Sequence, residues 1–442
     1  MIGMGYVGTS LAVTLAARGR DVVGVDRDPR ICRMLMEKKS HVYEADLELE
    51  KAIDSGKLRL RSTIPADPTI DTYIVCVGTP VDERGHPDLT HVDAVVENLA
   101  AVAADGALVI LRSTVSVGTT RRITRGLLEA GGKRIDVAFC PERTVQGAAV
   151  LELQSLPQIV AGASPRARER AIELFRGLTN QTIEVDDLEA AEIAKLACNS
   201  FRYTTFAFSN ELARLCESVG VSMSEVRRAA TLGYGRAAIP SPGPVGGSCL
   251  PKDVRILARA FQDFAAPAST FLAEVSQVHR GVPQQIADTV LERFRKLPET
   301  GQPRLALLGV AFKGDPPTDD ERSSPSVELL AQLRACLPAA IVRSHDPLVD
   351  VERQRALGYH PCATPEEAVV GAQIVILGTN HARYREISLV ELTNYTNPHC
   401  VVYDVWALHL AEGGELREGV EYVAFGESWL SKYRLAGTVC GV

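Results

Sequence analysis

The sequence predicts an α/β protein in which two doubly wound domains are joined by a central helical domain. Three observations lead to this prediction: a glycine-rich fingerprint opens the chain, short β-rich runs alternate with helical stretches near both ends, and strand signals vanish between about Leu188 and Arg280. Alternating strands and helices indicate βαβ units, which build parallel sheets covered by helices. The length of 442 residues allows two or three domains of ordinary size.

The first element is a dinucleotide-binding fingerprint. Gly3, Gly5 and Gly8 fit the pattern G-x-G-x-x-G, and residues 10–20 continue with the apolar spacing of a helix. The first glycine makes a tight turn, the second lets a pyrophosphate approach the backbone, and the third lets helix and strand pack closely. Asp26 ends the next β-rich run, where a carboxylate takes the ribose hydroxyls and repels the 2′-phosphate of NADP. The pattern therefore predicts a Rossmann-like domain that binds NAD.

The strand that should precede this fingerprint is largely missing. Only Met1 and Ile2 come before the first glycine, although the preceding strand is central in a doubly wound sheet. We expect a gap between neighbouring strands, with unpaired backbone groups that lower stability. We interpret the printed start as misassigned or trimmed, and the intact mass of the natural product tests this interpretation.

The rest of the first domain follows the alternation. Residues 72–77, 107–111 and 135–139 are β-rich, and residues 92–103 and 120–129 have helical patterns. These runs predict βαβ units and a parallel sheet.

Polar loops follow two of these strands. Thr79 and Pro80 come after the first run, and Ser113 and Thr114 come after the second. Open α/β sheets bind ligands at the carboxyl ends of their strands, so these residues are candidates for cofactor contacts. The alternative is that they are ordinary turn and cap residues.

The middle of the chain predicts helices. Residues 189–220 form one long amphipathic pattern in which Lys195 and Asn199 are four residues apart and share a helix face. Such a pair can hold an oxyanion or a water in a cleft, although it is more often part of a solvated stripe. Alternation of strands and helices resumes after a proline-containing linker. The patterns place the domains at residues 1–187, 188–297 and 303–442.

Cys249 is a candidate nucleophile. It stands in a glycine-rich stretch that begins at Gly243, and Lys252 and Asp253 follow within four residues. A nearby ammonium group, exposed backbone N–H groups and partial exposure favour the thiolate, which is the nucleophilic form of cysteine. The alternative is a small buried hydrophobic residue, the commoner role of a lone cysteine.

Composition limits the remaining classes of protein. A net charge of −7 argues against nucleic acid or an anionic membrane as the main partner, and no apolar run approaches the length of a membrane span. The 10 cysteines form no C-x-x-C pair, and the 9 histidines show no ligand spacing. We therefore expect a cytoplasmic protein with reduced thiols and no catalytic metal.

The motifs together resemble the UDP-glucose/GDP-mannose dehydrogenase family. In chain order they are G-x-G-Y-V-G from Gly3, V-G-T-P from Val77, R-S-T-V-x-x-G-T-T from Arg112, C-P-E-R from Cys140, K-x-x-x-N from Lys195, G-G-S-C-L-P-K-D from Gly246 and A-F-K from Ala311. The resemblance runs from residue 3 to about residue 410. It implies an NAD-binding domain, a helical dimerising middle and a C-terminal domain that binds a UDP-sugar, in a homodimer or higher homo-oligomer.

The resemblance also implies a reaction. The C6 alcohol of a UDP-hexose is oxidised to the uronic acid in two hydride transfers to NAD, and the Cys249 thiol holds the carbon first as a thiohemiacetal and then as a thioester. Lys195, Asn199 and Asp253 match positions that steady the oxyanion and handle the proton through water. Glu142 matches the carboxylate assigned to thioester hydrolysis, and Thr114 matches a residue that assists the same water.

Binding roles carry over in the same way. The implied catalytic residues are Cys249, Lys195, Asn199, Asp253, Glu142 and Thr114. The implied cofactor residues are Gly3, Gly5, Tyr6, Val7, Gly8, Asp26, Arg30, Thr79, Pro80, Ser113, Thr114, Lys252 and Arg322. The implied substrate residues are Glu142, Arg143, Lys195, Asn199, Arg236, Ile239, Pro240, Gly246 and Lys313.

The sequence departs from the family pattern of many UDP-glucose enzymes after Glu142. Arg143 stands in place of an aromatic residue and Gln146 in place of an acid, which is more similar to branches that oxidise UDP-N-acetylhexosamines. The motif around Cys249 resembles the UDP-glucose branch instead. N-acetylglucosamine, N-acetylmannosamine and glucose therefore all remain open as the sugar, with an N-acetylated sugar favoured.

Two other functions remain as alternatives. A two-electron hydroxyacid dehydrogenase needs the fingerprint and a lysine, but neither the cysteine nor a second α/β domain. A catalytically impaired protein that binds NAD or a nucleotide sugar is compatible with the missing first strand, although the retained Cys249 and Lys195 argue against it.

Overall fold

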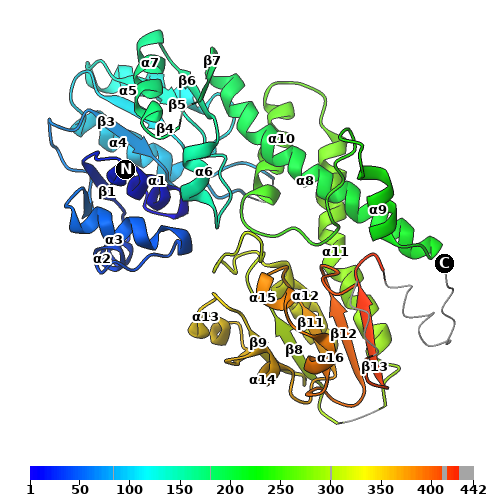
Figure 1. Ribbon diagram of the computed structural model, residues 1–442. Coiled ribbons are helices and arrows are strands. Elements are labelled where there is room, and N and C mark those ends of the chain that lie inside the picture. The colour runs from blue at the N-terminus through cyan, green and yellow to red at the C-terminus, as the bar shows by residue number, and fades with distance from the viewer. Residues whose placement is uncertain (83, 180, 299–300, 411–415, 428–442) are drawn as a thin grey trace. The chain divides into compact units, whose positions relative to one another are not determined.

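The computed structural model describes residues 1–82, 84–179, 181–298, 301–410 and 416–427. The chain divides into two compact units. Figure 1 colours the chain by residue number, from blue at the N-terminus to red. The first unit holds Met1–Ser200 and Lys252–Ser269, and the second holds Phe201–Pro251 and the chain from Thr270 onward. The helical middle of the chain is therefore shared between the units, and the bounds of the three predicted domains stay a prediction.

The first unit is built on two sheets. Its main sheet has the strand order β3-β4-β5-β6-β7, and β1 pairs in parallel with β2 in a separate two-stranded sheet. Ile2 forms isolated parallel bridges to both Val25 and Val75, and so connects the two sheets at one residue. The strands are β1 (Val22–Val25), β2 (Leu58–Arg61), β3 (Thr72–Val75), β4 (Leu108–Leu111), β5 (Asp136–Phe139), β6 (Gln158–Gly162) and β7 (Thr182–Val185).

Helices cover both faces of these strands. Ile74 joins one apolar cluster, whereas Tyr73 and Val75 join another, because successive side chains of a strand point to opposite faces. A strand buried on both faces is typical of a sheet in an α/β protein. The helices are α1 (Tyr6–Ala17), α2 (Pro29–Met36), the 3₁₀ helix η1 (Tyr43–Ala45), α3 (Asp46–Asp54), α4 (Thr90–Val102), α5 (Thr119–Gly131), α6 (Ala149–Ser155) and α7 (Pro165–Arg176), with parts of α8 (Leu188–Val219) and α10 (Leu250–Asp263).

One pair of strands differs from the expected parallel sheet. β5 and β6 are antiparallel, with Ala138 opposite Gly162 and Phe139 opposite Ala161. The connection between them places the short helix α6 against α1. The chain therefore returns along the sheet in the opposite direction without the crossover that a parallel neighbour requires.

The second unit contains one six-stranded parallel sheet with the order β10-β9-β8-β11-β12-β13. Its chain starts at β8, winds outward through β9 and β10, and then returns past β8 to β11 (Figure 1). The strands are β8 (Arg304–Leu308), β9 (Ile341–His345), β10 (His360–Pro361), β11 (Ile374–Leu377), β12 (Cys400–Asp404) and β13 (Val420–Ala424). The order reverses at β8, so the residues after Leu308 lie at a switch point where such sheets bind ligands.

The helices of the second unit include the long helix α11 and the end of α8. The complete helices are α9 (Met223–Thr231), α11 (Thr270–Phe294), α12 (Pro325–Cys336), α13 (Val351–Ala356), α14 (Pro365–Val369), α15 (Ala382–Arg385) and α16 (Leu389–Thr393). Of the helices in the described part of the chain, none is both long and apolar enough to cross a membrane. The two doubly wound sheets and the helical segment confirm the predicted fold class.

Candidate active site

The three fingerprint glycines have different surroundings. Gly3 has a φ of +88°, and a Cβ atom there would lie 2.8 Å from the carbonyl oxygen of Cys76. A Cβ atom on Gly8 would lie 1.8 Å from the carbonyl oxygen of Gly3. A Cβ atom on Gly5 would meet nothing within 4 Å. The first and third glycines are thus required by packing, whereas Gly5 leaves open the space that a pyrophosphate needs.

Helix α1 begins at Tyr6 directly after this open space, and Gly5 provides no side-chain cap. The first amides of a helix have no partner within the helix, so those of Tyr6 and Val7 are suited to an anion. Asp26 lies at the end of β1, where its Oδ2 accepts a hydrogen bond of 2.8 Å from the Met4 amide. This contact fixes the carboxylate and leaves acceptor capacity for ribose hydroxyls. The first amides of α1 and the Asp26 carboxylate are therefore suited to the pyrophosphate and the ribose of NAD.

The Arg30 side chain pairs with Asp28, the residue that caps the N-terminus of α2. Its guanidinium group forms an ion pair of 2.7 Å with Asp28, and its side chain is 86% exposed. Arg30 was predicted to contact the cofactor, and that role stays a prediction.

The loops after β3 and β4 are joined by hydrogen bonds. The Thr79 hydroxyl donates to the carbonyl oxygen of Thr114 over 2.6 Å, and Ser113 donates to the carbonyl oxygen of Val77 over 2.7 Å. The Lys252 ammonium group donates to the Thr79 hydroxyl over 3.2 Å. The predicted cofactor residues Thr79, Ser113, Thr114 and Lys252 are therefore brought together at the carboxyl edge of the sheet. Pro80, which is exposed, adjoins them in sequence.

A buried carboxylate continues this network. Oδ2 of Asp253 accepts a hydrogen bond of 2.6 Å from the Asn199 amide and lies 4.0 Å from the Lys195 ammonium nitrogen. Oδ1 lies 3.6 Å from the Lys252 ammonium nitrogen, and among the described residues it accepts no hydrogen bond. The side chain of Asp253 is 1% exposed. The structure thus assembles Lys195, Asn199 and Asp253 from α8 and α10, with one carboxylate oxygen available to a water or a reacting hydroxyl.

Glu142 lies in a second buried network. Its Oε2 pairs with the fully buried guanidinium group of Arg112, which also donates to the carbonyl oxygen of Cys140 and to the Gln158 side chain. Oε1 accepts hydrogen bonds from the amides of Arg143 and Thr144. Both oxygens of the carboxylate are therefore held in place.

Electrostatics keep Glu142 ionised. Burial by itself raises the pKa of the carboxyl group, but the charge of Arg112 and the hydrogen bonds from Arg112 and two backbone amides outweigh burial. The pKa of Glu142 consequently lies below its ordinary value. The neighbouring Arg143 side chain donates to the carbonyl oxygen of Pro157.

In the second unit, α8 holds the loop that leads to Cys249. The Asn210 side chain accepts a hydrogen bond of 2.8 Å from the Gly243 amide and donates one of 3.0 Å to the Gly243 carbonyl oxygen. The Ser209 hydroxyl donates to the carbonyl oxygen of Pro240 over 2.7 Å. These bonds fix the loop, and Cys249 at its end is exposed, with its Sγ 3.8 Å from the Ser248 hydroxyl.

The glycines of this loop pack against the C-terminal part of the chain. A Cβ atom on Gly246 would lie 2.4 Å from Cδ of Pro325, and Gly247 has a φ of +82° and faces the Phe312 ring. The Gly247 amide donates to the carbonyl oxygen of Ser323 over 3.1 Å. The structure therefore brings Gly246 close to the switch point after β8, where Lys313 lies 5.7 Å from the centre of the Phe312 ring.

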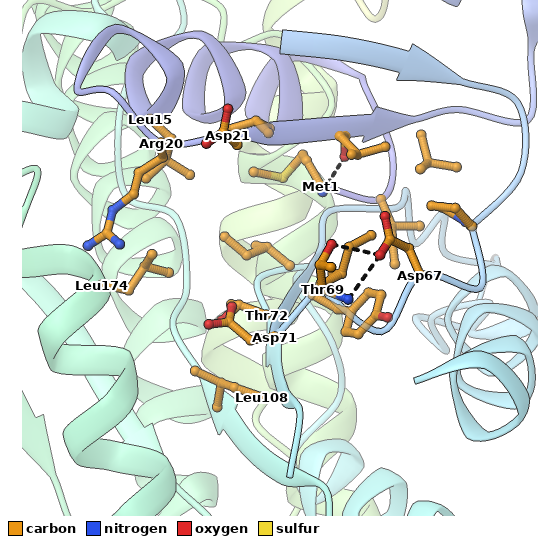
Figure 2. Close-up of a pocket in the computed structure, with 18 of the residues that line it drawn as sticks. Met1, Leu15, Arg20, Asp21, Asp67, Thr69, Asp71, Thr72, Leu108 and Leu174 are labelled. Carbon is orange, nitrogen blue, oxygen red and sulfur yellow. Dashed lines mark hydrogen bonds between the residues drawn. The ribbon is translucent and has the colours of Figure 1, made fainter. Parts of the chain in front are cut away.

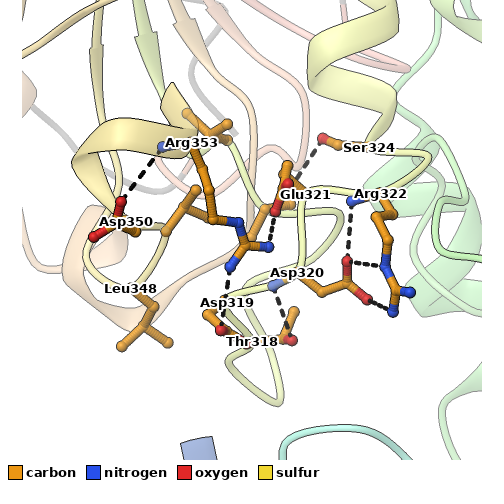
Figure 3. Close-up of polar contacts among 12 residues, drawn as sticks. Thr318, Asp319, Asp320, Glu321, Arg322, Ser324, Leu348, Asp350 and Arg353 are labelled. Carbon is orange, nitrogen blue, oxygen red and sulfur yellow. Dashed lines mark hydrogen bonds and ion pairs between the residues drawn. The ribbon is translucent and has the colours of Figure 1, made fainter. Parts of the chain in front are cut away.

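The other predicted ligand residues of the second unit include two arginines that contact side chains of the protein. Figure 3 shows Arg322 paired with Asp320, with a 2.8 Å contact between them. Arg322 is 60% exposed in its side chain, whereas Asp320 is 3% exposed. Arg236 lies over the ring of Tyr234 and is exposed, and Ile239 is half-buried. Arg236 and Arg322 thus have protein partners in this state.

Sequence reasoning missed three residues that organise these sites. Arg112 pairs with Glu142, Gln158 accepts a hydrogen bond from Arg112, and Asn210 holds the loop before Cys249. A signal existed for Arg112, because a charge that directly follows the apolar run 107–111 in a buried sheet needs a partner. Asn210 stands among apolar residues of the long helix, which is a similar but weaker signal.

Comparison with known proteins decides the family. The profile of the UDP-glucose/GDP-mannose dehydrogenase family matches in three parts: its NAD-binding domain at residues 1–179, its central domain at 189–280 and its UDP-binding domain at 306–409. The chain belongs to this family. The match confirms the predicted resemblance and identifies an NAD-dependent nucleotide-sugar dehydrogenase.

Individual relatives of this dehydrogenase resemble it over nearly its whole length. The NDP-N-acetyl-D-galactosaminuronic acid dehydrogenase of Ralstonia solanacearum is 30% identical over 403 residues, covering 88% of this chain and 91% of that protein. The UDP-N-acetyl-D-mannosamine dehydrogenase of Escherichia coli K12 is 30% identical over 407 residues, covering 88% and 94%.

Solved structures agree with the fold of the dehydrogenase. The UDP-D-ManNAc dehydrogenase from Pyrococcus horikoshii has a TM-score of 0.85 at 28% identity, over 97% of this chain and 98% of that one. The UDP-glucose dehydrogenase from the archaeon Pyrobaculum islandicum has a TM-score of 0.81 at 27% identity, over 95% and 96%.

Proposed function

We propose that this dehydrogenase oxidises the C6 alcohol of a UDP-N-acetylhexosamine to the uronic acid, with Cys249 as the covalent nucleophile. The observation that carries the proposal is the buried network in which Asn199, Asp253, Lys252 and Thr79 are joined by direct contacts. These residues come from three separate motifs of the sequence, and they place an acid–base group beside the predicted cofactor loops.

The oxidation of the alcohol to the carboxylate proceeds in four steps. The alcohol loses a proton and a hydride and becomes an aldehyde. The Cys249 thiolate adds to the aldehyde carbon and the oxygen takes a proton, which gives a thiohemiacetal. Loss of a second hydride and of the hydroxyl proton gives a thioester. Water then attacks, the C–S bond breaks, and the carboxylate and the free thiolate result. NAD supplies the hydride acceptor when bound.

Asp253 and its neighbours perform the proton work. Oδ2 of Asp253 is occupied by Asn199, whereas Oδ1 accepts no hydrogen bond from the described residues. A water on Oδ1 can take the proton of the alcohol, and the Lys195 ammonium group then stabilises the developing oxyanion.

Glu142 has a different role from Asp253. Because Arg112 keeps its pKa low and both its oxygens accept hydrogen bonds, Glu142 is a poor proton acceptor but a fixed negative charge. Such a carboxylate orients the hydrolytic water through its remaining lone pairs. We assign the orientation of that water to Glu142 and the transfer of protons to Asp253.

The choice of an N-acetylated sugar has two supports. Arg143 replaces the aromatic residue of the UDP-glucose pattern, and relatives at 30% identity are named for N-acetylated sugars. The structure of a UDP-glucose enzyme is nevertheless similar, so the assay compares all the candidate sugars directly.

We further propose a homodimer formed through the second half of α8. Phe201, Phe208 and Leu215 recur every seven residues, which places them on one side of the helix, and their exposed fractions are 71%, 55% and 58%. Apolar side chains in such a row are typical of a surface that another subunit covers. The described cysteines are all free, which is compatible with the predicted cytoplasmic location.

The test counts NADH formed per sugar consumed. UDP-glucose, UDP-N-acetylglucosamine, UDP-N-acetylmannosamine and GDP-mannose are offered to the wild-type enzyme and to Cys249→Ser, with the exposed Cys336→Ser as matched control. We expect two NADH per sugar with one UDP-N-acetylhexosamine, loss of turnover in Cys249→Ser, and full activity in Cys336→Ser.

Other outcomes favour the alternatives. One NADH per sugar with no effect of Cys249→Ser contradicts the thioester mechanism and favours a two-electron dehydrogenase. NAD binding by calorimetry without NADH from any sugar favours a catalytically impaired binding protein.

A further inference from the structure

The loop between β5 and α6 carries two of the predicted substrate residues, Glu142 and Arg143. Backbone amides along residues 142–149 donate to the carboxylate groups of three different glutamates. Hydrogen bonds to an ionised carboxylate are roughly twice as strong as those between neutral groups. The conformation of the 142–149 loop therefore depends on these three acceptors.

Two of the glutamates belong to the loop itself or to the helix that follows it. Oε1 of Glu142 accepts hydrogen bonds of 2.7 Å and 2.8 Å from the amides of Arg143 and Thr144. Oε2 of Glu152, on α6, accepts a hydrogen bond of 2.6 Å from the Val145 amide. These contacts join residues close together in the sequence, so the first half of the loop is held locally.

The third glutamate comes from a distant segment of the chain. Glu44 lies in η1, between α2 and α3, and its Oε1 accepts hydrogen bonds of 2.9 Å from the Gly147 amide and 3.3 Å from the Ala149 amide. Gly147 has a φ of +94°, a conformation that a glycine adopts without steric cost. The second half of the loop is thus held by a residue 103 positions away in the sequence.

The surroundings of η1 keep Glu44 in place. Val42 and Ala45, on either side of Glu44, are both 0% exposed, and η1 packs against α1, α3 and α6. His41, at the start of the same segment, meets the ring of Tyr6 edge-on, with 5.5 Å between the ring centres. A carboxylate on a packed segment of this kind can set the position of a loop, because its own backbone is held by other contacts.

The hydrogen bonds also decide which way the peptide groups of the loop face. The N–H and C=O groups of a trans peptide point in opposite directions. The carbonyl groups of Arg143, Thr144 and Gln146 therefore point away from the carboxylates that hold the next amide in the chain. Carbonyl oxygens accept hydrogen bonds from hydroxyl and amide N–H groups. In this conformation the loop presents acceptors that suit an N-acetylated hexose.

We propose that Glu44 is a positioning residue for sugar recognition, which holds the 142–149 loop in the conformation that receives the hexose of the UDP-sugar. The inference rests on the proposed function, because it takes the hexose as the ligand of this loop. Glu44 acts through the amides of Gly147 and Ala149. Without its carboxylate these amides lose their acceptor, and the second half of the loop has to be ordered again each time a sugar binds.

The test compares three variants of the full chain with the wild type. Glu44→Ala removes the acceptor, and Glu44→Gln keeps an oxygen acceptor without the charge. Glu48→Ala is the matched control, because Glu48 is half-buried like Glu44, and the described amides of the loop donate to other glutamates. Hydrogen exchange is followed at the Gly147 and Ala149 amides. Calorimetry gives the affinity for UDP and for the UDP-sugar that the wild type binds most tightly.

We expect Glu44→Ala to speed exchange of both amides about tenfold or more. We also expect it to weaken binding of the UDP-sugar about tenfold, because part of the binding free energy is then spent on ordering the loop. The affinity for UDP alone should stay within about twofold of the wild type, since UDP has no hexose for the loop to contact. Glu44→Gln should lose less affinity than Glu44→Ala, and Glu48→Ala should match the wild type.

Equal losses of affinity for UDP and for the UDP-sugar in Glu44→Ala would overturn the proposal, since they would indicate a general disturbance of the fold. Wild-type exchange rates in Glu44→Ala, or a wild-type affinity for the UDP-sugar, would overturn it as well. The proposed function fails by a different observation, namely binding of UDP-sugars by the wild type without formation of NADH. Neither exchange nor calorimetry without NAD requires turnover, so that failure leaves the comparison of the variants unchanged.

Discussion

The two doubly wound sheets of this dehydrogenase differ at their centres. In the second unit, β8 pairs along all five of its residues with β9 and along four with β11. In the first unit, the corresponding position between β1 and β3 is taken by the first residues of the chain, where Ile2 bridges Val25 and Val75, and Met1 and Gly3 hydrogen-bond to β1. The centre of the second sheet therefore pairs along whole strands, whereas the centre of the first pairs along the short segment Met1–Gly3, beside a cavity of about 510 Å³ (Figure 2). We therefore expect packing changes at the centre of the first sheet to be tolerated better than the same changes in the second.

The predicted site residues of the two units differ in their exposure. The first unit buries Arg112, Glu142 and Asp253 and pairs them with one another or with amides. The second unit exposes Cys249 and Arg322. Acid–base groups work best in surroundings that hold their geometry, while a nucleophile has to be reached by its substrate.

The largest effect is expected where the first unit buries its charges. Arg112→Met removes the partner of Glu142 and should lower the free energy of unfolding by about 4 kcal/mol, because it leaves a buried carboxylate without compensation. Urea unfolding measures the loss. Adding Glu142→Gln to Arg112→Met should restore about half of it, and no recovery in the double variant would contradict this explanation.

The acid–base assignment predicts a loss of activity without a comparable loss of stability. Asp253→Asn should reduce kcat about a hundredfold or more, because the neutral amide is not a proton acceptor. Asp263→Asn on the same helix, where the aspartate is exposed, is the matched control. Steady-state kinetics with saturating sugar provide the measurement, and equal kcat values in the two variants would refute the assignment.

Equivalent substitutions at the two sheet centres should lower the free energy of unfolding by different amounts, and this difference is the next smaller effect. Leu307 and Ile2 are 0% and 5% exposed, and each lies in a central strand position. Leu307→Ala should cost about 4 kcal/mol, whereas Ile2→Ala should cost about 2 kcal/mol because the site beside the cavity can collapse. Denaturant unfolding of the two variants measures the difference, which should vanish if the cavity has no influence on packing.

Acidification should weaken the second unit through a buried histidine. Burial lowers the pKa of His279 to about 4, and its ring stacks on Tyr203 at 3.8 Å between centres. The unfolded chain therefore binds a proton at a higher pH than the folded one, and stability falls as the pH drops below about 6.5. From pH 7 to pH 5 we expect a loss of about 1–2 kcal/mol.

His279→Phe keeps the stacking and removes the titration, so it should abolish this loss. Glu142 behaves differently, because its pKa is lowered and its contribution is present above the usual carboxyl range and lost only at more acidic pH. Unfolding curves followed at several pH values, with probes in each unit, separate the two windows.

Much of this protein follows from local patterns in the sequence. The spacing of Gly3, Gly5 and Gly8 and the place of Asp26 determined the turn, the helix and the cofactor, because these features depend on neighbouring residues. The alternation of strands and helices determined the fold class in the same way. The ordered motifs then indicated the family, which the comparisons confirmed.

Only the tertiary structure decided which distant groups meet. The pairing of Arg112 with Glu142, the hold of Asn210 on Gly243 and the reversed direction of β6 all join segments far apart in the chain. Local propensity carries no information about such partners, because their contacts arise when whole helices and strands pack together.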